Sequence, residues 1–233
     1  MPVFPLASAG ILLAAAALLA LATMPSSPST ERKAMVRLPP PDTAGRMAVE
    51  RALLLRRSVR SYSARPLTLS TVSQLLWAAQ GTTAPDGRRT APSAGGLCPL
   101  EIHLVASRVE ELPQGLYRYS SSSHSLHLSA SGHMAPLFAK ASGDQDFITD
   151  AAAVVLIAAV EQRTARKYGS RSPRYVVFEA GAASENLALQ AVALGLGSVV
   201  VGAFDDARVA KLARLRGNEQ PLCLMPVGYA AIE

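Results

Sequence analysis

Three arginines and a serine follow an apolar stretch and could bind an anion. They are Arg56, Arg57, Ser58 and Arg60, and residues 47–55 before them have the apolar spacing of a helix. A guanidinium stays charged at physiological pH and can hold a phosphate through two parallel N–H donors. These cations therefore either complement the dipole at the end of the helix or bind a phosphorylated ligand.

A second stretch consists of small residues that can approach a flat ligand closely. It spans residues 89–96 and has Pro92, Ser93, Ala94 and Gly95 at its centre. Short side chains and glycine leave the backbone accessible, and proline bends the chain. Together with the preceding arginines, this stretch predicts a site for a planar, phosphorylated cofactor.

The elements that position these two stretches follow from the apolar periodicity. The helix over residues 174–194 is apolar on most sides and is expected to be central. The unbroken apolar run over residues 151–160 predicts a strand covered on both faces. We expect further helices over residues 47–55, 70–81 and 161–168 and from residue 205, and further strands over residues 100–106, 116–119, 125–128, 199–201 and 222–227.

The composition argues against several other functions. The 233-residue chain has a net charge of +6 but lacks the alternation of basic and aromatic residues found in single-strand binders, so we expect no nucleic-acid partner. The two cysteines, Cys98 and Cys223, cannot form a four-ligand zinc site. His124 and His127 point to opposite faces of an extended segment and are no metal pair. We therefore expect no metal site.

The chain is predicted to have three parts. Residues 1–24 carry no charge and are mostly apolar, which favours an export signal peptide. An uncleaved membrane anchor and a misplaced start codon are the alternatives. The first two interpretations place the protein outside the cytoplasm, and the third leaves it in the cytoplasm. Residues 25–46 are rich in proline and serine and predict an extended linker, and residues 47–233 form the folded domain.

Taken together, the motifs resemble those of the nitroreductase superfamily of FMN enzymes, in particular its SagB-type dehydrogenase or azoline oxidase branch. The resemblance extends from about residue 38 to residue 229. The motifs that carry it, in chain order, lie at residues 38–42, 56–60, 75–81, 91–96, 167–169, 179–183, 194–198 and 202–205.

The resemblance implies an α+β sandwich, in which helices flank a central mixed or antiparallel sheet and one long helix is central. It also implies a homodimer that carries two FMN sites at its interface. Residues 47–233 would then be a nitroreductase-like FMN-binding domain.

The same resemblance implies a role for each cofactor-binding residue. Arg56 and Arg60 would hold the phosphate and ribityl end of FMN, and Arg57 and Ser58 would approach the ribityl chain and the pyrimidine edge. On the other side, the flavin ring would lie against the residues at the centre of the second stretch and near a later loop, namely Pro92, Ser93, Ala94, Gly95, Gly202 and Ala203.

The reaction implied by the resemblance is hydride transfer through flavin N5, with NAD(P)H as a possible electron donor. The substrate would be a small molecule or a modified peptide. In the azole-forming branch a Lys-Tyr pair is linked to proton removal, and Lys167 and Tyr168 stand in the matching place. Either residue could act as the general base, and the alternative is a solvated helix end.

Two other functions remain open at this point. One is a generic NAD(P)H-dependent nitro or quinone reductase. The other is a flavin-binding scaffold or partner subunit without turnover, which the absence of a basic residue after Tyr229 and the presence of Cys98 favour.

Overall fold

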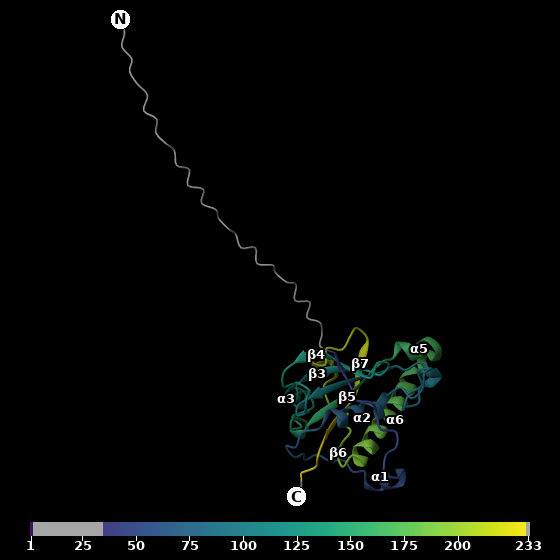
Figure 1. The fold of residues 1–233 in the computed structure, drawn as a ribbon. Helices are drawn as coiled ribbons and strands as arrows, with labels where there is room; N and C mark the ends of the chain where they lie inside the picture. Colours follow the sequence, from purple (N-terminus) through teal and green to yellow (C-terminus); the bar gives the residue numbers. More distant parts are fainter. Residues whose placement is uncertain (2–34, 232–233) are drawn as a thin grey trace. The chain divides into compact units, whose positions relative to one another are not determined.

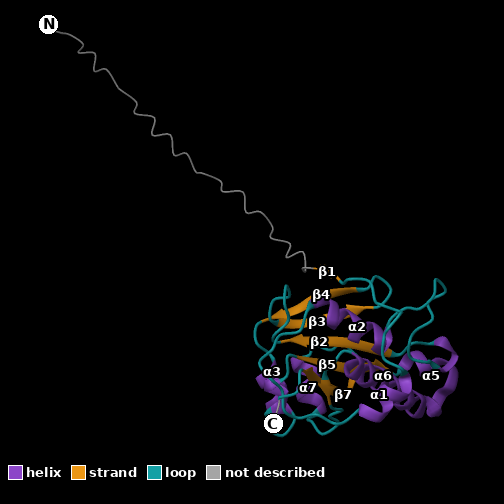
Figure 2. Cartoon of the chain, turned by 60° about the horizontal axis from the view of Figure 1, so that its bottom comes forward, coloured by secondary structure: helices purple, strands orange, loops and turns teal. Residues whose placement is uncertain are grey.

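The protein is built around one antiparallel sheet. The structure, a computed structural model, describes residues 35–231. Seven strands lie in the order β1-β4-β3-β2-β5-β7-β6, and every neighbouring pair is antiparallel. Figure 2 shows them stacked edge to edge, with helices on both faces. The predicted α+β fold with a sheet flanked by helices is confirmed.

Side chains of the strands point alternately into two apolar cores, one on each face of the sheet. They are β1 (Met35–Arg37), β2 (Leu100–Ala106), β3 (Gly115–Ser120), β4 (Ser125–Ser131), β5 (Ala153–Val160), β6 (Gly197–Ser198) and β7 (Glu219–Gly228). In β2, Ile102 and Leu104 face one core and Val105 faces the other, as expected when successive side chains point to opposite faces. Each residue from 151 to 159 is at most 1% exposed, which confirms the prediction of a strand covered on both faces.

Two long helices cover the first face. Helix α2 (Leu69–Gln80) begins where the Thr68 side chain accepts a hydrogen bond from the Thr71 amide, and it ends at Gly81. Helix α6 (Ser172–Ala193) packs against α2 and the sheet. The predicted central helix is thus confirmed, and its buried side lies in the larger core.

Shorter helices complete the fold. The second face is covered by α3 (Ala135–Ala141), α4 (Phe147–Asp150) and α7 (Asp206–Leu212), whose apolar side chains form the smaller core. Helix α1 (Val49–Leu55) lies against α6, as Figure 1 shows, and α5 (Gln162–Tyr168) leads through the 3-10 turn η2 (Gly169–Arg171) into α6. A second 3-10 turn, η1 (Ala94–Gly96), lies within the small-residue stretch.

Two segments differ from the sequence prediction. Residues 35–46 belong to the predicted linker, but β1 pairs with β4 and Leu38 is buried, so residues 35–38 are part of the folded domain. The strand predicted over residues 199–201 is displaced to β6, and Val201 makes only an isolated bridge to Leu224. Val200 is half exposed, which explains why an apolar run alone misplaced this strand.

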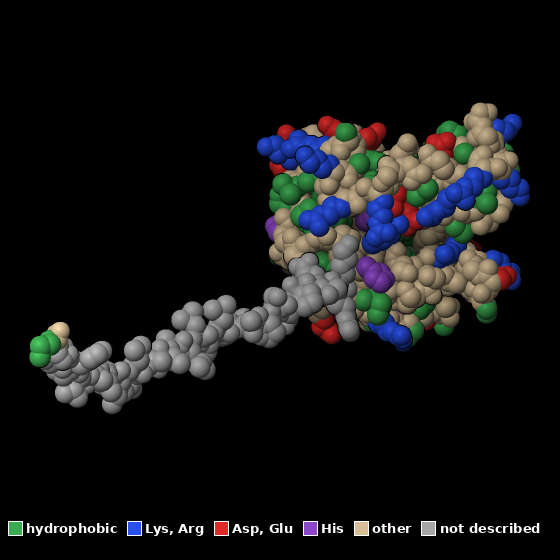
Figure 3. Space-filling model, turned by 90° about the horizontal axis from the view of Figure 1, so that it is seen from above, with side chains coloured by type: hydrophobic (Ala, Val, Ile, Leu, Met, Phe, Trp, Pro, Cys, Tyr) green, Lys and Arg blue, Asp and Glu red, His purple; other side chains and the backbone are tan. Residues whose placement is uncertain are grey.

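The N-terminal prediction lies outside the described residues. Residues 1–24 were expected to form a signal peptide or an anchor, and nearly all of them belong to the segment that the structure does not describe. Between residues 35 and 231, no helix has both the length and the apolar character needed to cross a membrane. On the face seen in Figure 3, lysine and arginine side chains lie in several separate groups.

A buried ion pair joins strands that are not neighbours in the sheet. Arg118 of β3 donates from Nη1 to Glu219 Oε1 of β7 at 2.7 Å, and the Glu219 side chain is only 3% exposed. Burial alone would raise the pKa of Glu219. The neighbouring His103 ring, the hydrogen bond and charge of Arg118 and the Arg216 amide outweigh burial and lower this pKa to about 2.

We expect the Glu219→Gln variant to lose stability in a pH-dependent way. Because the folded-state pKa is depressed, the carboxylate stabilises the fold above its usual value of 4.5, and this contribution disappears as the pH falls towards 2. Urea unfolding should show a loss of about 3 kcal/mol at pH 7 and a smaller loss at pH 3. Glu110→Gln, a change at an exposed glutamate, is the control. Equal losses at both pH values would contradict this interpretation.

Candidate functional site

The arginine cluster begins at the end of helix α1. Arg56 caps this helix, and its Nε lies 3.8 Å from Glu185 Oε1 of α6. Arg57 is exposed and donates to the carbonyls of Leu54 and Arg56. Arg60 is also exposed, and within residues 35–231 neither it nor Arg57 has an ion-pair partner. The cluster therefore presents two uncompensated cations to solvent.

The segment that carries these arginines is fixed to the sheet. Ser58 forms a parallel bridge with Ser198 of β6, and the Val59 amide donates to the Ser198 carbonyl at 3.0 Å. A Cβ on Gly197 would lie 2.6 Å from the Val59 side chain, so only glycine allows this close approach. The Tyr62 hydroxyl donates to the Val59 carbonyl at 2.7 Å. The cluster thus has a defined position despite its exposure.

The small-residue loop, residues 92–98, is held in place by a hydrogen bond to helix α6 and by one within the loop. The Ala94 amide donates to Glu179 Oε1 at 2.8 Å, and the Cys98 amide donates to the Ser93 hydroxyl at 2.8 Å. Gly95 has a φ of +63°, in the left-handed region that favours glycine. These hydrogen bonds fix the loop in a conformation whose outer surface is backbone and small side chains.

Glu179 is a buried carboxylate directly beneath this loop. The residue is 4% exposed, and its Oε2 has no hydrogen-bond partner among the described residues. Burial raises its pKa, and the Ala94 amide and the Ser93 hydroxyl partly offset this rise. An unpaired buried oxygen is costly, so the hydrogen bond that Glu179 makes through its other oxygen to the Ala94 amide is its main compensation among the described residues.

The predicted Lys-Tyr pair lies against the same loop. A Cβ on Gly95 would be 3.0 Å from the Tyr168 hydroxyl and 3.1 Å from the Lys167 ammonium nitrogen. The Tyr168 ring also packs edge-on against Tyr175 of α6, with ring centroids 4.8 Å apart. The structure therefore brings a phenol and an ammonium group to the loop that was predicted to support a planar cofactor.

Neighbouring residues of helix α6 connect the loop region to the arginine cluster. Glu185 faces Arg56, and the next residue, Asn186, donates from Nδ2 to the Thr90 carbonyl at 3.2 Å. Glu179 lies six residues before Glu185, which is about 9 Å along the helix axis. The two predicted stretches, about 35 residues apart in sequence, thus both contact α6, the loop region through Glu179 and Asn186 and the arginine cluster through the exposed Glu185, which lies about 100° around the helix from Asn186.

Two predicted residues are not brought to this loop. Gly202 and Ala203 lie between β6 and α7, where the Ala203 carbonyl accepts from Gln145 Nε2 at 3.2 Å. Within the part of the chain that the structure describes, no hydrogen bond joins them to residues 92–95.

Three residues of α6 were not predicted as part of the site. Glu179, Glu185 and Asn186 are polar residues on a helix that is otherwise mostly apolar. For Glu179 and Asn186 that contrast was the available signal, because a polar group on the covered side of a helix needs a partner. Sequence alone did not show which partner each one contacts.

The loop also borders an open cavity. This cavity has a volume of about 460 Å³, which is within the usual range for small-molecule sites. Its lining includes Arg89, Pro92, Ser93 and the free thiol of Cys98. Within residues 35–231, no group of three or more His, Cys, Asp or Glu side chains is placed to hold a metal ion. The small residues of the lining leave room for an organic ligand beside the loop.

Comparisons with known proteins agree with this architecture. The model of the nitroreductase family matches residues 53–229. A nitroreductase-family protein of Methanocaldococcus jannaschii is 42% identical over 180 residues, covering 77% of this chain and 90% of that protein.

Solved structures share the same fold. The crystal structure of a nitroreductase-family protein from Ralstonia eutropha JMP134 is 32% identical, with a TM-score of 0.76, and the match covers 88% of this chain and 92% of that one. The NADPH:FMN oxidoreductase of Vibrio harveyi is 20% identical, with a TM-score of 0.59, and the match covers 79% of this chain and 69% of that one. The fold, the motifs and the matched range together lead to one conclusion, namely that this chain belongs to the nitroreductase family of oxidoreductases.

Proposed function

We propose that this protein is an FMN-dependent oxidoreductase that transfers hydride to or from a small molecule or a modified peptide, with NAD(P)H as electron donor in the reductive direction. The observation that carries the proposal is the attachment of both predicted stretches to neighbouring residues of α6, through Arg56 with Glu185 and Thr90 with Asn186. Membership in a family that generally uses FMN supports the choice of cofactor.

The residues present fit the chemistry of FMN. Arg60 supplies an exposed guanidinium group without an ion-pair partner in residues 35–231, which together with Arg56 suits a phosphate, and Arg57, also exposed and without such a partner, would reach the ribityl chain. Ser58 would approach the ribityl chain. The loop supplies small residues, and a Cβ on Gly96 would meet nothing within 4 Å, so the backbone there is open to a flat ring. Gly202 and Ala203 would reach the ring only if a second copy of the chain completes the site.

The Lys-Tyr pair would exchange protons with the substrate. Bound FMN supplies hydride acceptance and donation at N5 of its ring. Lys167 and Tyr168, held against Gly95, would take up the proton that a substrate loses on oxidation or return it on reduction. Glu179 would support this arrangement by fixing the Ala94 amide, next to Gly95.

We favour the SagB-type branch over a generic nitro or quinone reductase. The support is the placement of the Lys-Tyr pair at the loop, since a reductase that delivers hydride to a quinone has less need of a fixed general base. The Vibrio harveyi relative is named for NADPH and FMN, and this likeness favours a nicotinamide donor for the present chain as well.

Absorption spectroscopy tests the proposal. The purified protein, reconstituted with FMN if necessary, should show a flavin spectrum that bleaches on anaerobic addition of NADH or NADPH. A protein that cannot take up FMN would contradict the proposal. A flavin spectrum that no donor bleaches would favour a scaffold without turnover.

The unpaired arginines should determine FMN affinity. We expect Arg60→Met and Arg57→Met each to weaken FMN binding by about tenfold, because each removes a charge-assisted hydrogen bond worth roughly 1.5–3 kcal/mol. Equilibrium dialysis with FMN and with riboflavin, which lacks the phosphate, gives the measurement. Riboflavin affinity should stay unchanged in Arg60→Met, which removes a phosphate contact, and should fall together with FMN affinity in Arg57→Met, which removes a contact to the ribityl chain. Arg214→Met, at an exposed arginine outside the cluster, is the control.

The Lys-Tyr pair should affect turnover more than cofactor binding. We expect Tyr168→Phe and Lys167→Ala to lower kcat by about 10²-fold, the usual contribution of a positioned proton donor or acceptor. Turnover is measured with NADH and a nitroaromatic acceptor, and FMN content is determined in parallel. Wild-type turnover in both variants would remove these residues from the mechanism.

Helices α1 and α6 carry an exposed apolar patch that favours a homodimer. Its members are Val49, Leu53, Leu54 and Leu55 of α1 and Val177 and Phe178 of α6, each between 41% and 63% exposed. The two helices contact each other. Large exposed apolar side chains on adjoining helices mark an interaction surface, and nitroreductase folds often form dimers. We propose that a second copy of the chain covers this patch.

Charged substitutions in the patch should dissociate the dimer. We expect Leu54→Asp combined with Phe178→Asp to yield a monomer, because desolvating a carboxylate in an apolar contact is unfavourable by several kcal/mol. Size-exclusion chromatography with light scattering gives the mass. Leu137→Asp, at an exposed leucine of α3, is the matched control. A wild-type chain that is already monomeric would contradict the proposed dimer.

A further inference from the structure

Helix α5, which carries the Lys-Tyr pair, cannot hold its position by itself. It has seven residues, no side-chain hydrogen bond at its N-terminal cap, and only Thr164 among its buried residues. A helix this short is marginal in water, and most of its stability must come from contacts with the rest of the protein. The position of Lys167 and Tyr168 therefore depends on what anchors α5.

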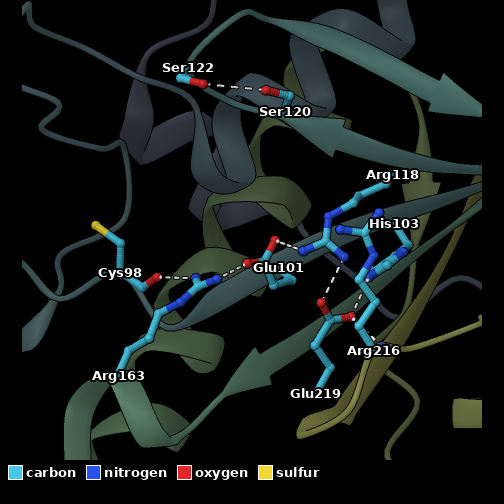
Figure 4. Close-up of polar contacts among 9 residues, drawn as sticks. All are labelled: Cys98, Glu101, His103, Arg118, Ser120, Ser122, Arg163, Arg216 and Glu219. Carbon is cyan, nitrogen blue, oxygen red and sulfur yellow. Dashed lines mark hydrogen bonds and ion pairs between the residues drawn. The ribbon is translucent and has the colours of Figure 1, made fainter. Parts of the chain in front are cut away.

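Arg163 of α5 contacts two other segments at once. Its Nη1 donates to the Cys98 carbonyl at 2.9 Å, and its Nη2 donates to Glu101 Oε1. Cys98 ends the small-residue loop, and its own amide donates to Ser93. Figure 4 shows the Arg163 side chain lying between Cys98 and Glu101. One guanidinium thus ties the helix to the loop and to the start of β2.

The carboxylate that receives Arg163 is itself fixed. Glu101 Oε2 pairs with Arg118 Nη2 at 2.8 Å, and Arg118 Nη1 pairs with Glu219 at 2.7 Å. The Glu101 side chain is 13% exposed, and the His103 Nε2 lies 3.6 Å from Glu219. Figure 4 shows these groups as a continuous chain across the strands. Buried charges with two partners each have little freedom to move, so Glu101 is a rigid anchor.

The other polar contacts of this region do not reach the loop. Asn218 donates to Gln162 Oε1 at 2.7 Å on the exposed side, and the Ser172 hydroxyl donates to Glu161 Oε1 at 2.6 Å. The former joins α5 to the turn before β7, and the latter joins the start of α5 to α6. Among the hydrogen bonds of the described residues, those of Arg163 link α5 directly to residues 92–98.

We propose that Arg163 is a positioning residue, which places Lys167 and Tyr168 against Gly95 by tying α5 to the Cys98 carbonyl and to Glu101. It does not touch the reacting groups. The expected effect on turnover rests on the proposed function. The contacts of Arg163 with the Cys98 carbonyl and Glu101 do not depend on that function. A displacement of about 1 Å at a reacting group can cost up to 10²-fold in rate, so the loss of the tie should be measurable.

The first test measures the helix without any cofactor. In the full-length protein we expect Arg163→Met to speed hydrogen exchange of the amides in residues 162–168 by about tenfold, which corresponds to a local loss of roughly 1.4 kcal/mol. Arg163→Lys keeps the charge but lacks the planar fork and should give a similar increase. Asn218→Ala, which removes an exposed contact of the same helix, is the matched control and should change exchange much less.

The second test asks whether the tie acts through the Lys-Tyr pair. With NADH and a nitroaromatic acceptor, Arg163→Met should lower kcat by about tenfold in the wild-type background. In a Lys167→Ala/Tyr168→Phe background the same change should lower kcat less than about twofold, since coupled residues are not additive.

The outcomes separate this inference from the proposed function. Unchanged hydrogen exchange in Arg163→Met would contradict the claim that Arg163 anchors α5, whatever the effect on turnover. Equal losses of kcat in the two backgrounds overturn the positioning role. If the wild-type protein takes up no FMN, the proposed function fails while the exchange result still tests the tie.

Discussion

The packing of helix α6 against the sheet is the constraint on which the candidate site depends. This helix lies in the larger core, with Ala183, Leu187 and Ala191 fully buried. On the side of the helix that faces the core, a polar side chain needs a partner, and Glu179 and Asn186 find theirs in the backbone of residues 90–94. The hydrophobic packing that stabilises the fold thereby also sets the position of the small-residue loop.

Much of this arrangement could be predicted from the sequence because it follows from local patterns. The strand over residues 151–160 is covered on both faces, and its apolar run had to be buried somewhere. The loop was recognisable from its small residues, and the arginines from their charge. These patterns could not show which segments and side chains pair with one another in the fold. The edge strand β1 is held by backbone hydrogen bonds to β4, which leave no mark on side-chain periodicity, and residues 35–37 therefore looked like linker. Arg163 could not be singled out from the sequence because its partner, Glu101, lies 62 positions away in the chain.

Two glycines allow segments of the candidate site to approach each other closely. At Gly197 a side chain would collide with Val59, and at Gly95 it would reach the Tyr168 hydroxyl and the Lys167 ammonium group. In the first place the missing side chain lets the arginine segment lie on the sheet, and in the second it lets polar groups reach the loop. Both glycines therefore serve contact between segments distant in sequence, which composition alone does not reveal.

The exposed arginines and the exposed apolar patch share helix α1 and its end, and this proximity links ligand binding to association. Leu54 and Leu55 lie directly before Arg56 and Arg57. If a second copy of the chain covers the leucines, it also removes water from around the adjacent guanidinium groups, and burying unpaired cations opposes association. A bound phosphate would neutralise them and remove that opposition. By linkage, a dimer that forms more readily with the anion present must also bind the anion more tightly than the monomer does. A cofactor with a phosphate group and the second subunit would then stabilise each other, which is a physical reason for placing an anion site at the edge of an apolar contact.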